Sequence, residues 1–396
     1  MAADEQPPPQ FGDHYRTIYA FGAGGQKPTL PISWAELERR AEAALEPTAA
    51  GYVFGSAGSE DTARENERAF GEWRIVPRTL RDISRRELGV SLLGLSWPAP
   101  VALAPIGVQT IVHPEGELAS SRGAAALGVP MTAGTVAGHT MERIAEELGD
   151  CPRMFQLYWP NDPELAASFL GRAEAAGYGA VVVTVDNAFP GWKPRDLQNA
   201  YLPFIHGEGL ANFFADPVFR DSLEQSPEED QGAAVGRFIG VFGNPGLTWK
   251  DLDSLRSMTS LPIVIKGILH PDDAREAAER GADGIVVSNH GGRQIDGAVA
   301  AIDALPAIVD AVGGQLSVLL DSGIRSGADA VKALALGAEA VLLGRPYLWG
   351  LALEGADGVE GVLRNFLAEL DLTMALSGCI SPDGLGPELL VRRQAA

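Results

Sequence analysis

Between Val101 and Arg345 the sequence alternates short apolar runs with amphipathic segments, and this alternation limits the possible folds more than any other feature. The apolar runs are residues 101–107, 129–134, 153–158, 180–186, 262–267, 284–290, 317–323 and 340–345. Each run is continuously apolar, as expected for parallel strands that are buried on both faces. Eight such units in succession predict an α/β fold, a closed (β/α)8 TIM barrel, with a doubly wound open sheet as the alternative.

The segments outside this pattern suggest how the rest of the chain is organised. Residues 1–30 are rich in Pro, Gly and polar side chains and are expected to form a flexible N-terminal arm. An amphipathic helix is predicted from Ser33, so an N-terminal helical segment should open a single domain over residues 31–382. Residues 383–396 are expected to form a C-terminal tail.

One connection in the barrel pattern is far longer than a single helix requires. It follows the fourth strand, between Asp186 and Leu261, and is rich in Phe, Gly, Pro and acidic residues. Loops after barrel strands lie at the C-terminal mouth, and long loops in compact domains usually have a function. We therefore predict a long lid loop at about 195–247, with a disordered insertion or a contact between subunits as the alternative.

The charge balance excludes several classes of partner. The 396 residues carry 52 acidic and 31 basic side chains, for a formal net charge of −21. A surface of that sign repels nucleic acids and anionic membranes, so we expect binding to neither. An anionic ligand would require Arg and Lys side chains placed locally in its site.

The cysteines and the apolar stretches give expectations about metals and location. Cys151 and Cys379 lie far apart, and no Cys/His cluster has metal-ligand spacing, so we expect no metal site. The N-terminus lacks the basic and apolar regions of a secretory signal. The most apolar stretch, residues 333–353, is interrupted by two charged residues and a proline. These features predict a cytoplasmic protein.

Two of the predicted strand ends suggest a phosphate site. The seventh strand is followed by Gly323 and Arg325, and the eighth by Gly344 and Arg345. Glycines let backbone N–H groups approach an anion, the following helix N-terminus contributes its dipole, and the arginines contribute charge. Barrels often bind phosphate after strands 7 and 8.

The sixth predicted strand ends in a histidine and an arginine separated by two glycines. His290 can take up a proton near neutral pH, and Arg293 can grip a carboxylate with two hydrogen bonds. Asp186, at the end of the fourth strand, is a candidate partner for His290. Lys266 ends the fifth strand and is predicted to place a cation at the same mouth.

Three segments resemble the family of FMN-dependent L-2-hydroxy-acid oxidases and dehydrogenases. They are SNHGGRQIDG, LDSGIRSGADAVKALALGAEAVLLGRP and LTMALSGC, and the likeness extends from about residue 31 to residue 382. Within the family, the chain is most similar to the lactate 2-monooxygenase branch. That likeness rests on YRTIYAFGAGGQKPTLPISWAELE, on Gly107, on PGWKPRDL and on the long connection after the fourth strand.

The resemblance implies FMN as the cofactor. The residues implied to line or bind it are Pro105, Ile106, Gly107, Gln156, Thr184, Lys266, Ser288, Asp321, Gly323, Arg325, Gly344 and Arg345. Gln156 and Thr184 are implied to bond the flavin ring, and Lys266 to stabilise negative charge on reduced FMN. The last five are implied to hold the ribityl chain and the phosphate.

The resemblance also implies the catalytic and substrate-binding groups. The implied catalytic residues are His290, Asp186, Tyr158 and Lys266. The implied substrate contacts are Tyr52, Tyr158, Lys193 and Arg293. Lys193 stands where the family usually has an arginine, and lysine keeps the charge but loses the bidentate fork. Gly134 and Val136 follow the second strand, where oxidases of the family often carry a serine and an aromatic residue, so the pocket wall is expected to differ.

The reaction implied by this likeness is the oxidation of L-lactate by O2 to acetate, CO2 and water. The alternatives are an oxidase that releases a 2-keto acid and H2O2, a dehydrogenase with another electron acceptor, and, from a different class, an FMN-barrel isomerase. Isomerases lack a His-Gly-Gly-Arg pairing directed at a carboxylate. The family resemblance further implies a homotetramer or homo-octamer.

Overall fold

The computed structural model describes residues 10–393, and within them the expected strands form a closed parallel barrel. The barrel strands are β4 (Val101–Leu103), β5 (Met131–Gly134), β6 (Arg153–Leu157), β7 (Val181–Thr184), β8 (Ile263–Ile268), β9 (Gly284–Val287), β10 (Ser317–Leu320) and β11 (Ala340–Leu343). They are hydrogen-bonded in the order β10-β11-β4-β5-β6-β7-β8-β9, and β9 returns to β10. The predicted (β/α)8 barrel is confirmed, and the open-sheet alternative is wrong.

The barrel is buried on both faces, which explains its continuously apolar strands. Side chains such as Met154, Val182 and Leu319 form an inner cluster. A hairpin of β2 (Val90–Leu92) and β3 (Leu95–Trp97) packs Trp97 against this cluster. Because side chains fill the interior of the barrel, a site is expected at the C-terminal ends of the strands.

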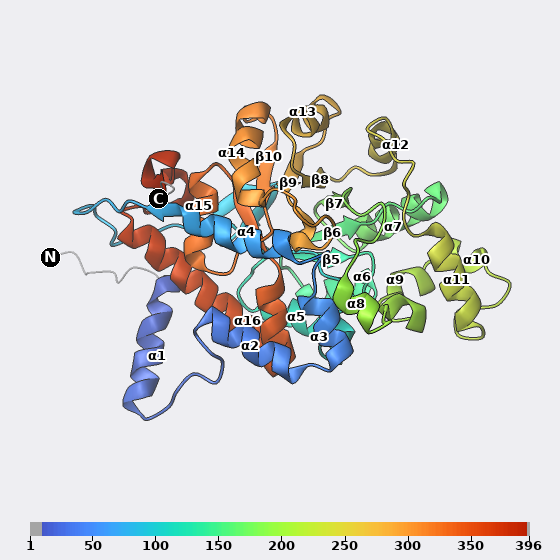
Figure 1. Cartoon of the computed structure of the whole chain (residues 1–396), viewed down its shortest axis with the longest axis horizontal. Helices are drawn as coiled ribbons and strands as arrows, with labels where there is room; N and C mark the ends of the chain where they lie inside the picture. Colours follow the sequence, from blue (N-terminus) through green and yellow to red (C-terminus); the bar gives the residue numbers. More distant parts are fainter. Residues whose placement is uncertain (1–9, 394–396) are drawn as a thin grey trace.

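Helices surround the barrel, as Figure 1 shows. They are α5 (Gly116–Ala125), α6 (Met141–Leu148), α7 (Pro163–Ala175), α12 (Asp251–Met258), α13 (Pro271–Glu279), α14 (Ala301–Val312), α15 (Gly327–Ala335) and α16 (Arg345–Leu376). Their apolar faces and the outward-facing strand residues together form the largest core cluster. The helix α16 is kinked at Gly355, whose φ is 58°.

The long connection after β7 is largely helical. It contains α8 (Pro194–Gln198), η3 (Pro203–His206), α9 (Ala211–Phe214), α10 (Pro217–Asp221) and α11 (Gln231–Val241). Phe238 is central to its own small core, with its ring 4.9 Å from Phe213 and 4.8 Å from Phe242. Asp216 and Asp230 cap α10 and α11 with their side chains. In Figure 1, α9, α10 and α11 lie together at the right-hand end of the molecule, and α8 lies nearer to α3.

The N-terminal segment forms α1 (His14–Ala23), α2 (Trp34–Ala44), α3 (Pro47–Phe54), α4 (Asp61–Glu72) and β1 (Trp73–Ile75). The expected flexible arm therefore contains a helix, α1, whose residues are all at least partly exposed; residues 1–9 lie outside the described range. In the expected tail, β12 (Leu390–Arg392) pairs with β1. The last described residues are thus tied to the N-terminal segment.

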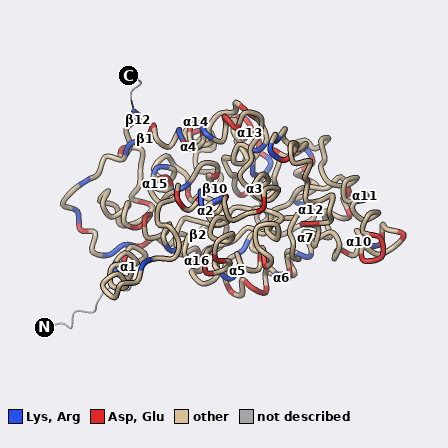
Figure 2. The backbone as a smooth tube through the Cα atoms, turned by 60° about the horizontal axis from the view of Figure 1, so that its bottom comes forward, with Lys and Arg blue, Asp and Glu red and all other residues tan. Residues whose placement is uncertain are grey.

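Charge is distributed along the whole chain. Figure 2 shows acidic and basic residues interspersed on most elements, with an acidic stretch in the loop after α10. Within residues 10–393, no helix has the length and apolarity needed to cross a membrane.

Candidate active site

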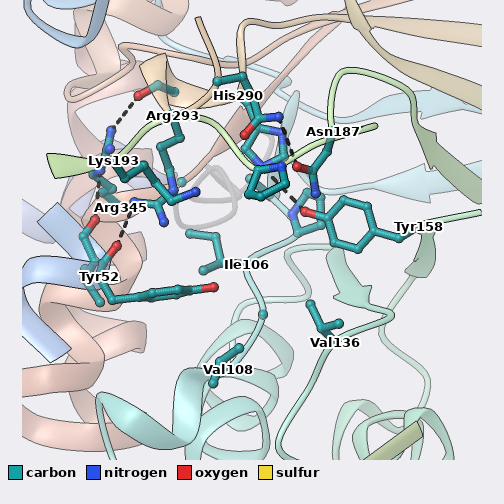
Figure 3. Close-up of a pocket in the computed structure, with 18 of the residues that line it drawn as sticks. Tyr52, Ile106, Val108, Val136, Tyr158, Asn187, Lys193, His290, Arg293 and Arg345 are labelled. Carbon is teal, nitrogen blue, oxygen red and sulfur yellow. Dashed lines mark hydrogen bonds between the residues drawn. The ribbon is translucent and has the colours of Figure 1, made fainter. Parts of the chain in front are cut away.

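A cavity of about 380 Å³ opens at the C-terminal ends of the barrel strands. Most of the predicted site residues line it, from Tyr52 in α3 to Arg345 at the start of α16. Figure 3 shows Arg293, Lys193 and Arg345 on one side with Tyr52, and His290, Asn187 and Tyr158 on the other. Four predicted residues lie behind the lining: Asp186, Gln156, Thr184 and Ser288.

His290 is held by a carboxylate. Its Nδ1 lies 2.8 Å from Oδ1 of Asp186, and its Nε2 lies 3.5 Å from the hydroxyl of Tyr158. Burial raises the pKa of Asp186, but His290 and Lys266 outweigh it and hold that pKa below its usual value. An ionised Asp186 keeps the proton on Nδ1, so Nε2 can accept a proton from a ligand in the cavity.

Tyr158 and Tyr52 remain neutral donors. Burial is the main cause that raises the pKa of each phenol, and Asp186 adds to the effect at Tyr158. Arg293 opposes the rise at Tyr52, where its guanidinium carbon lies 5.1 Å from the ring centroid. Both hydroxyls can therefore donate to an anionic ligand.

A second side of the cavity is cationic. Nη1 of Arg293 donates to the carbonyls of Tyr52 and Gly55, each at 2.6 Å, which fixes the guanidinium in place. Lys193 lines the same cavity, and its Nζ donates to the carbonyl of Gly191 at 3.4 Å. Two cations opposite a histidine base suit a ligand that carries a carboxylate.

The pKa of Lys193 is shifted by its surroundings. Burial, followed by the charge of Arg293, lowers the pKa of Lys193 to about 8, while Asp196 opposes the shift. Asp196 is buried, and neither of its carboxylate oxygens has a hydrogen-bond partner among the described residues. An arginine at position 193 would stay protonated in the same environment.

The expected flavin-ring contacts form a buried polar set beneath the cavity. Nζ of Lys266 donates to Oγ of Ser288 at 3.0 Å and lies 3.2 Å from Oδ2 of Asp321. Burial lowers the pKa of Lys266, but Asp321 and Asp186 together raise it overall, so the ammonium stays charged. Behind this wall, Nε2 of Gln156 donates to Oγ1 of Thr184 at 3.1 Å.

The predicted phosphate residues lie together and fit an anion. Gly323, Arg325, Gly344 and Arg345 all line the cavity. Burial, then the charges of Arg325 and Arg293, lower the pKa of Arg345 to about 9. The guanidinium of Arg345 donates to the carbonyls of Val53, Gly55 and Gly291 and to Oγ of Ser56, all of which are uncharged acceptors.

Arg325 also indicates that this part of the cavity suits an anion. Its Nη2 donates to Glu67 at 2.7 Å, but its buried Nε has no partner within residues 10–393. A phosphate would supply the missing acceptor and balance the two arginines. The residues present therefore fit FMN, with Arg325 and Arg345 at its phosphate.

The loop after β4 forms another wall, and Gly107 explains its shape. A Cβ at Gly107 would lie 2.1 Å from the carbonyl oxygen of Val136. The same carbonyl accepts a hydrogen bond from Val108 at 3.1 Å. Pro105, Ile106 and Gly107 line the cavity with Val136, so the two loops meet over it.

Several functional neighbours were not singled out from the sequence. Asn187 lines the cavity beside Tyr158, and Gln294 holds its loop by donating to the carbonyl of Asp186 at 2.7 Å. Oγ of Ser322 accepts from the amide of Gly291 at 3.0 Å. Gln294 lies in the motif SNHGGRQIDG and Ser322 in the motif LDSGIRSG, so these motifs could have indicated both residues. The sequence marks Asn187 only by its position after the fourth predicted strand. Phe204 and Phe238 of the lid also line the cavity.

Known proteins are similar to this chain in sequence and architecture. The family model for FMN-dependent dehydrogenases matches residues 41–392. An L-lactate oxidase of Lysinibacillus sphaericus is 44% identical over 363 residues, which cover 92% of this chain and 93% of the relative. An FMN-dependent alpha-hydroxy acid dehydrogenase of Schizosaccharomyces pombe is 43% identical over 389 residues, 95% of each protein.

Solved structures agree with these relatives. A crystal structure of mandelate oxidase matches with a TM-score of 0.82 at 39% identity, covering 92% of this chain and 99% of that one. The resemblance to the family of FMN-dependent 2-hydroxy-acid oxidases and dehydrogenases is confirmed, and with it FMN as the cofactor. This chain belongs to the FMN-dependent dehydrogenase family.

Proposed function

We propose that this flavoenzyme oxidises a small L-2-hydroxy acid, with L-lactate as the substrate. One observation carries the proposal: His290, paired with Asp186 at 2.8 Å, faces Arg293 and Lys193 across a single cavity. A base opposite a carboxylate clamp suits a molecule whose reacting carbon lies next to its carboxylate. Relatives named L-lactate oxidase and 2-hydroxyacid oxidase support the substrate class.

The proposed binding step uses the cationic side of the cavity. Arg293 and Lys193 neutralise the substrate carboxylate, and the neutral hydroxyls of Tyr52 and Tyr158 donate to the carboxylate or the substrate hydroxyl. Because the backbone carbonyls of Tyr52 and Gly55 fix Arg293, the carboxylate is held in one orientation. That orientation places the reacting carbon near His290.

The proposed chemical step is proton removal by Nε2 of His290. The proton comes either from Cα or from the hydroxyl, and Asp186 stabilises the imidazolium that forms. FMN bound in the cavity would supply the acceptor for the two electrons of the substrate, with O2 as the final oxidant. The ammonium of Lys266, buried beside Asp321, provides positive charge close to the expected flavin ring.

The fate of the keto acid decides the final products. Oxidation of lactate by O2 gives pyruvate and H2O2, and H2O2 can then decarboxylate pyruvate to acetate, CO2 and water. We propose that the second reaction occurs before pyruvate leaves, as in a lactate 2-monooxygenase. Apolar lid residues that line the cavity, Leu202, Phe204, Phe238 and Phe242, support retention, as does the close contact of Gly107 with Val136.

A second candidate is an oxidase that releases pyruvate and H2O2. The relative that is 44% identical over nearly its whole length carries the name L-lactate oxidase, which favours this outcome. Both candidates share every residue role up to formation of the keto acid. They differ only in whether the lid retains it.

Product analysis tests the proposal. FMN-loaded protein is mixed with L-lactate in air, and acetate, pyruvate, H2O2 and O2 uptake are measured together. Acetate with little free H2O2 supports the monooxygenase, whereas equal amounts of pyruvate and H2O2 identify an oxidase. Flavin bleaching without O2 uptake identifies a dehydrogenase. Bleaching only by larger 2-hydroxy acids would overturn lactate as the substrate.

A further inference from the structure

The turn that carries His290 has an unfavourable backbone conformation. His290 has a φ of 59°, and the two following glycines have φ values of 65° and 77°. A non-glycine residue adopts positive φ only when its surroundings hold it there. A side chain outside the turn should therefore supply this restraint.

Asn66 in α4 is one such side chain, alongside Ser322, whose Oγ accepts from two backbone amides of the turn. Asn66 is 2% exposed, and its amide makes a reciprocal pair with Asn289, the residue before His290. Nδ2 of Asn66 donates to Oδ1 of Asn289 at 2.8 Å, and Nδ2 of Asn289 donates to Oδ1 of Asn66 at 2.7 Å. The Asn289 oxygen also accepts from the amide of Gly292 at 3.1 Å, so the pair reaches both sides of His290.

The backbone of the turn rests directly on the start of α4. A Cβ at Gly292 would lie 2.6 Å from the amide nitrogen of Ala63, and the carbonyl of Gly292 accepts from Ala57 at 2.9 Å. Asp296, just beyond the turn, accepts from the amide of Asp61 at 2.7 Å. The helix is thus anchored to the segment that it supports.

The same turn of α4 also contacts the phosphate side of the site. A Cβ at Gly323 would lie 2.4 Å from the carbonyl oxygen of Asn66, and the adjacent Glu67 binds Arg325. One helical turn therefore touches both the segment that carries the base and the segment expected to hold the cofactor phosphate. Rigid support of this kind maintains a productive geometry.

We propose that Asn66 is a positioning residue for the catalytic base: its amide pair with Asn289 holds the His290 turn in the reactive conformation. This inference rests on the proposed role of His290. An apolar residue of similar size would remove one of the two donors to Oδ1 of the buried Asn289 amide and one of the two acceptors of its Nδ2, leaving the amide of Gly292 and the carbonyl of Val299 as its partners. Asn66 does not line the cavity; its side chain bonds Asn289 and, through Oδ1, the amide of Ala301 at 3.3 Å, so its effect on the base is transmitted through the turn.

The test compares Asn66→Ala and Asn66→Asp with wild type by anaerobic stopped-flow bleaching of bound flavin at saturating L-lactate. Asn66→Asp keeps the size and the acceptor for Asn289 but cannot donate, so it remains informative if the alanine variant does not fold. Arg68→Ala is the matched control, because Arg68 lies on the exposed face of the same helix.

We expect the limiting rate per bound flavin to fall by on the order of 100-fold in Asn66→Ala, the effect of misplacing a catalytic group by about 1 Å. The dissociation constants of FMN and L-lactate should change little, and Arg68→Ala should react as wild type does. The double variant Asn66→Ala/Asn289→Ala should lose less than the product of the two single losses, because the single losses share the amide pair, although Asn289 also bonds the amide of Gly292.

Unchanged limiting rates in both Asn66 variants, or a loss explained entirely by missing FMN, would overturn the positioning role. His290→Gln is measured alongside. If that variant reduces flavin as fast as wild type, the proposed function itself fails, whatever the Asn66 variants do. The two failures are therefore distinguishable.

Discussion

Lys193 shows how one side chain changes a shared site. Its ammonium keeps the charge that an arginine would provide, but burial and Arg293 lower its pKa to about 8. Substrate binding should therefore depend on pH in a range where a guanidinium would be insensitive. This dependence follows from a single position in an otherwise familiar motif.

The pH dependence gives a prediction about kcat/KM, which reports ionisations of the free enzyme. Below a pH of about 8 Lys193 is protonated and binds the substrate carboxylate; above it the charge is lost and kcat/KM for L-lactate should fall. The plateau at high pH should be about 10- to 100-fold lower, as expected for loss of a charged hydrogen bond. Lys193→Arg should remove this decline, and an identical decline in both proteins would show that another group causes it.

Arg325 allows a prediction about the cofactor. Because its buried Nε lacks a partner among the described residues and would meet the phosphate, Arg325→Ala should weaken FMN binding by about 10- to 100-fold. Fluorescence titration of the apoprotein with FMN measures the effect. Arg64→Ala is the control, because Arg64 is an exposed side chain of α4 that binds Ser59 and Asp61. Equal FMN affinity in wild type and Arg325→Ala would contradict the phosphate assignment.

At the scale of elements, the role proposed for the lid in retaining the keto acid can be tested directly. Phe238 of α11 packs against Phe204, Phe213 and Phe242 and lines the cavity. Phe238→Ala should loosen the lid, since removing a buried aromatic side chain costs about 3–5 kcal/mol of packing. The share of free pyruvate and H2O2 should rise relative to acetate, while flavin reduction by L-lactate persists.

Product ratios measure this effect, with Tyr19→Ala as the control because Tyr19 is an exposed aromatic residue of α1, outside the lid. An unchanged acetate fraction in Phe238→Ala would show that the lid core does not retain the keto acid.

The barrel strands could be predicted from sequence because parallel strands buried on both faces are continuously apolar, as in Val181–Thr184. Their C-terminal ends then placed Lys266 and His290 at one mouth. The lid helices could not be predicted, because elements as short as Ala211–Phe214 depend on packing among distant phenylalanines. The Asn66–Asn289 pair joins residues 223 positions apart, and no local pattern reports such a contact.

At the scale of the whole molecule, two segments that precede the barrel are bound to α16 through Asp371. Asp371 of α16 is fully buried and accepts from Nε of Arg86 at 2.5 Å and from the amide of Gly12 at 2.6 Å. The pairing of β1 with β12 closes the same region. Loops and segments from both ends of the described chain therefore contribute to one folded unit.

Asp371→Ala should lower the free energy of unfolding by about 3–5 kcal/mol, because it removes the carboxylate that pairs with Arg86 in a mostly buried position. Denaturant unfolding measures this change, and the double variant with Arg86→Ala should recover part of it. A change below about 1 kcal/mol, the range of exposed ion pairs, would contradict the structural role.

The central claim is that His290 takes a proton from an L-2-hydroxy acid held by Arg293 while electrons pass to FMN. Its most direct test mixes FMN-loaded wild type and His290→Gln with L-lactate without O2 and follows bleaching of the flavin. We predict rapid bleaching in wild type, and retained FMN with bleaching slowed at least about 100-fold in the variant. Equally fast bleaching in the variant, or none in wild type with any 2-hydroxy acid, would contradict the account.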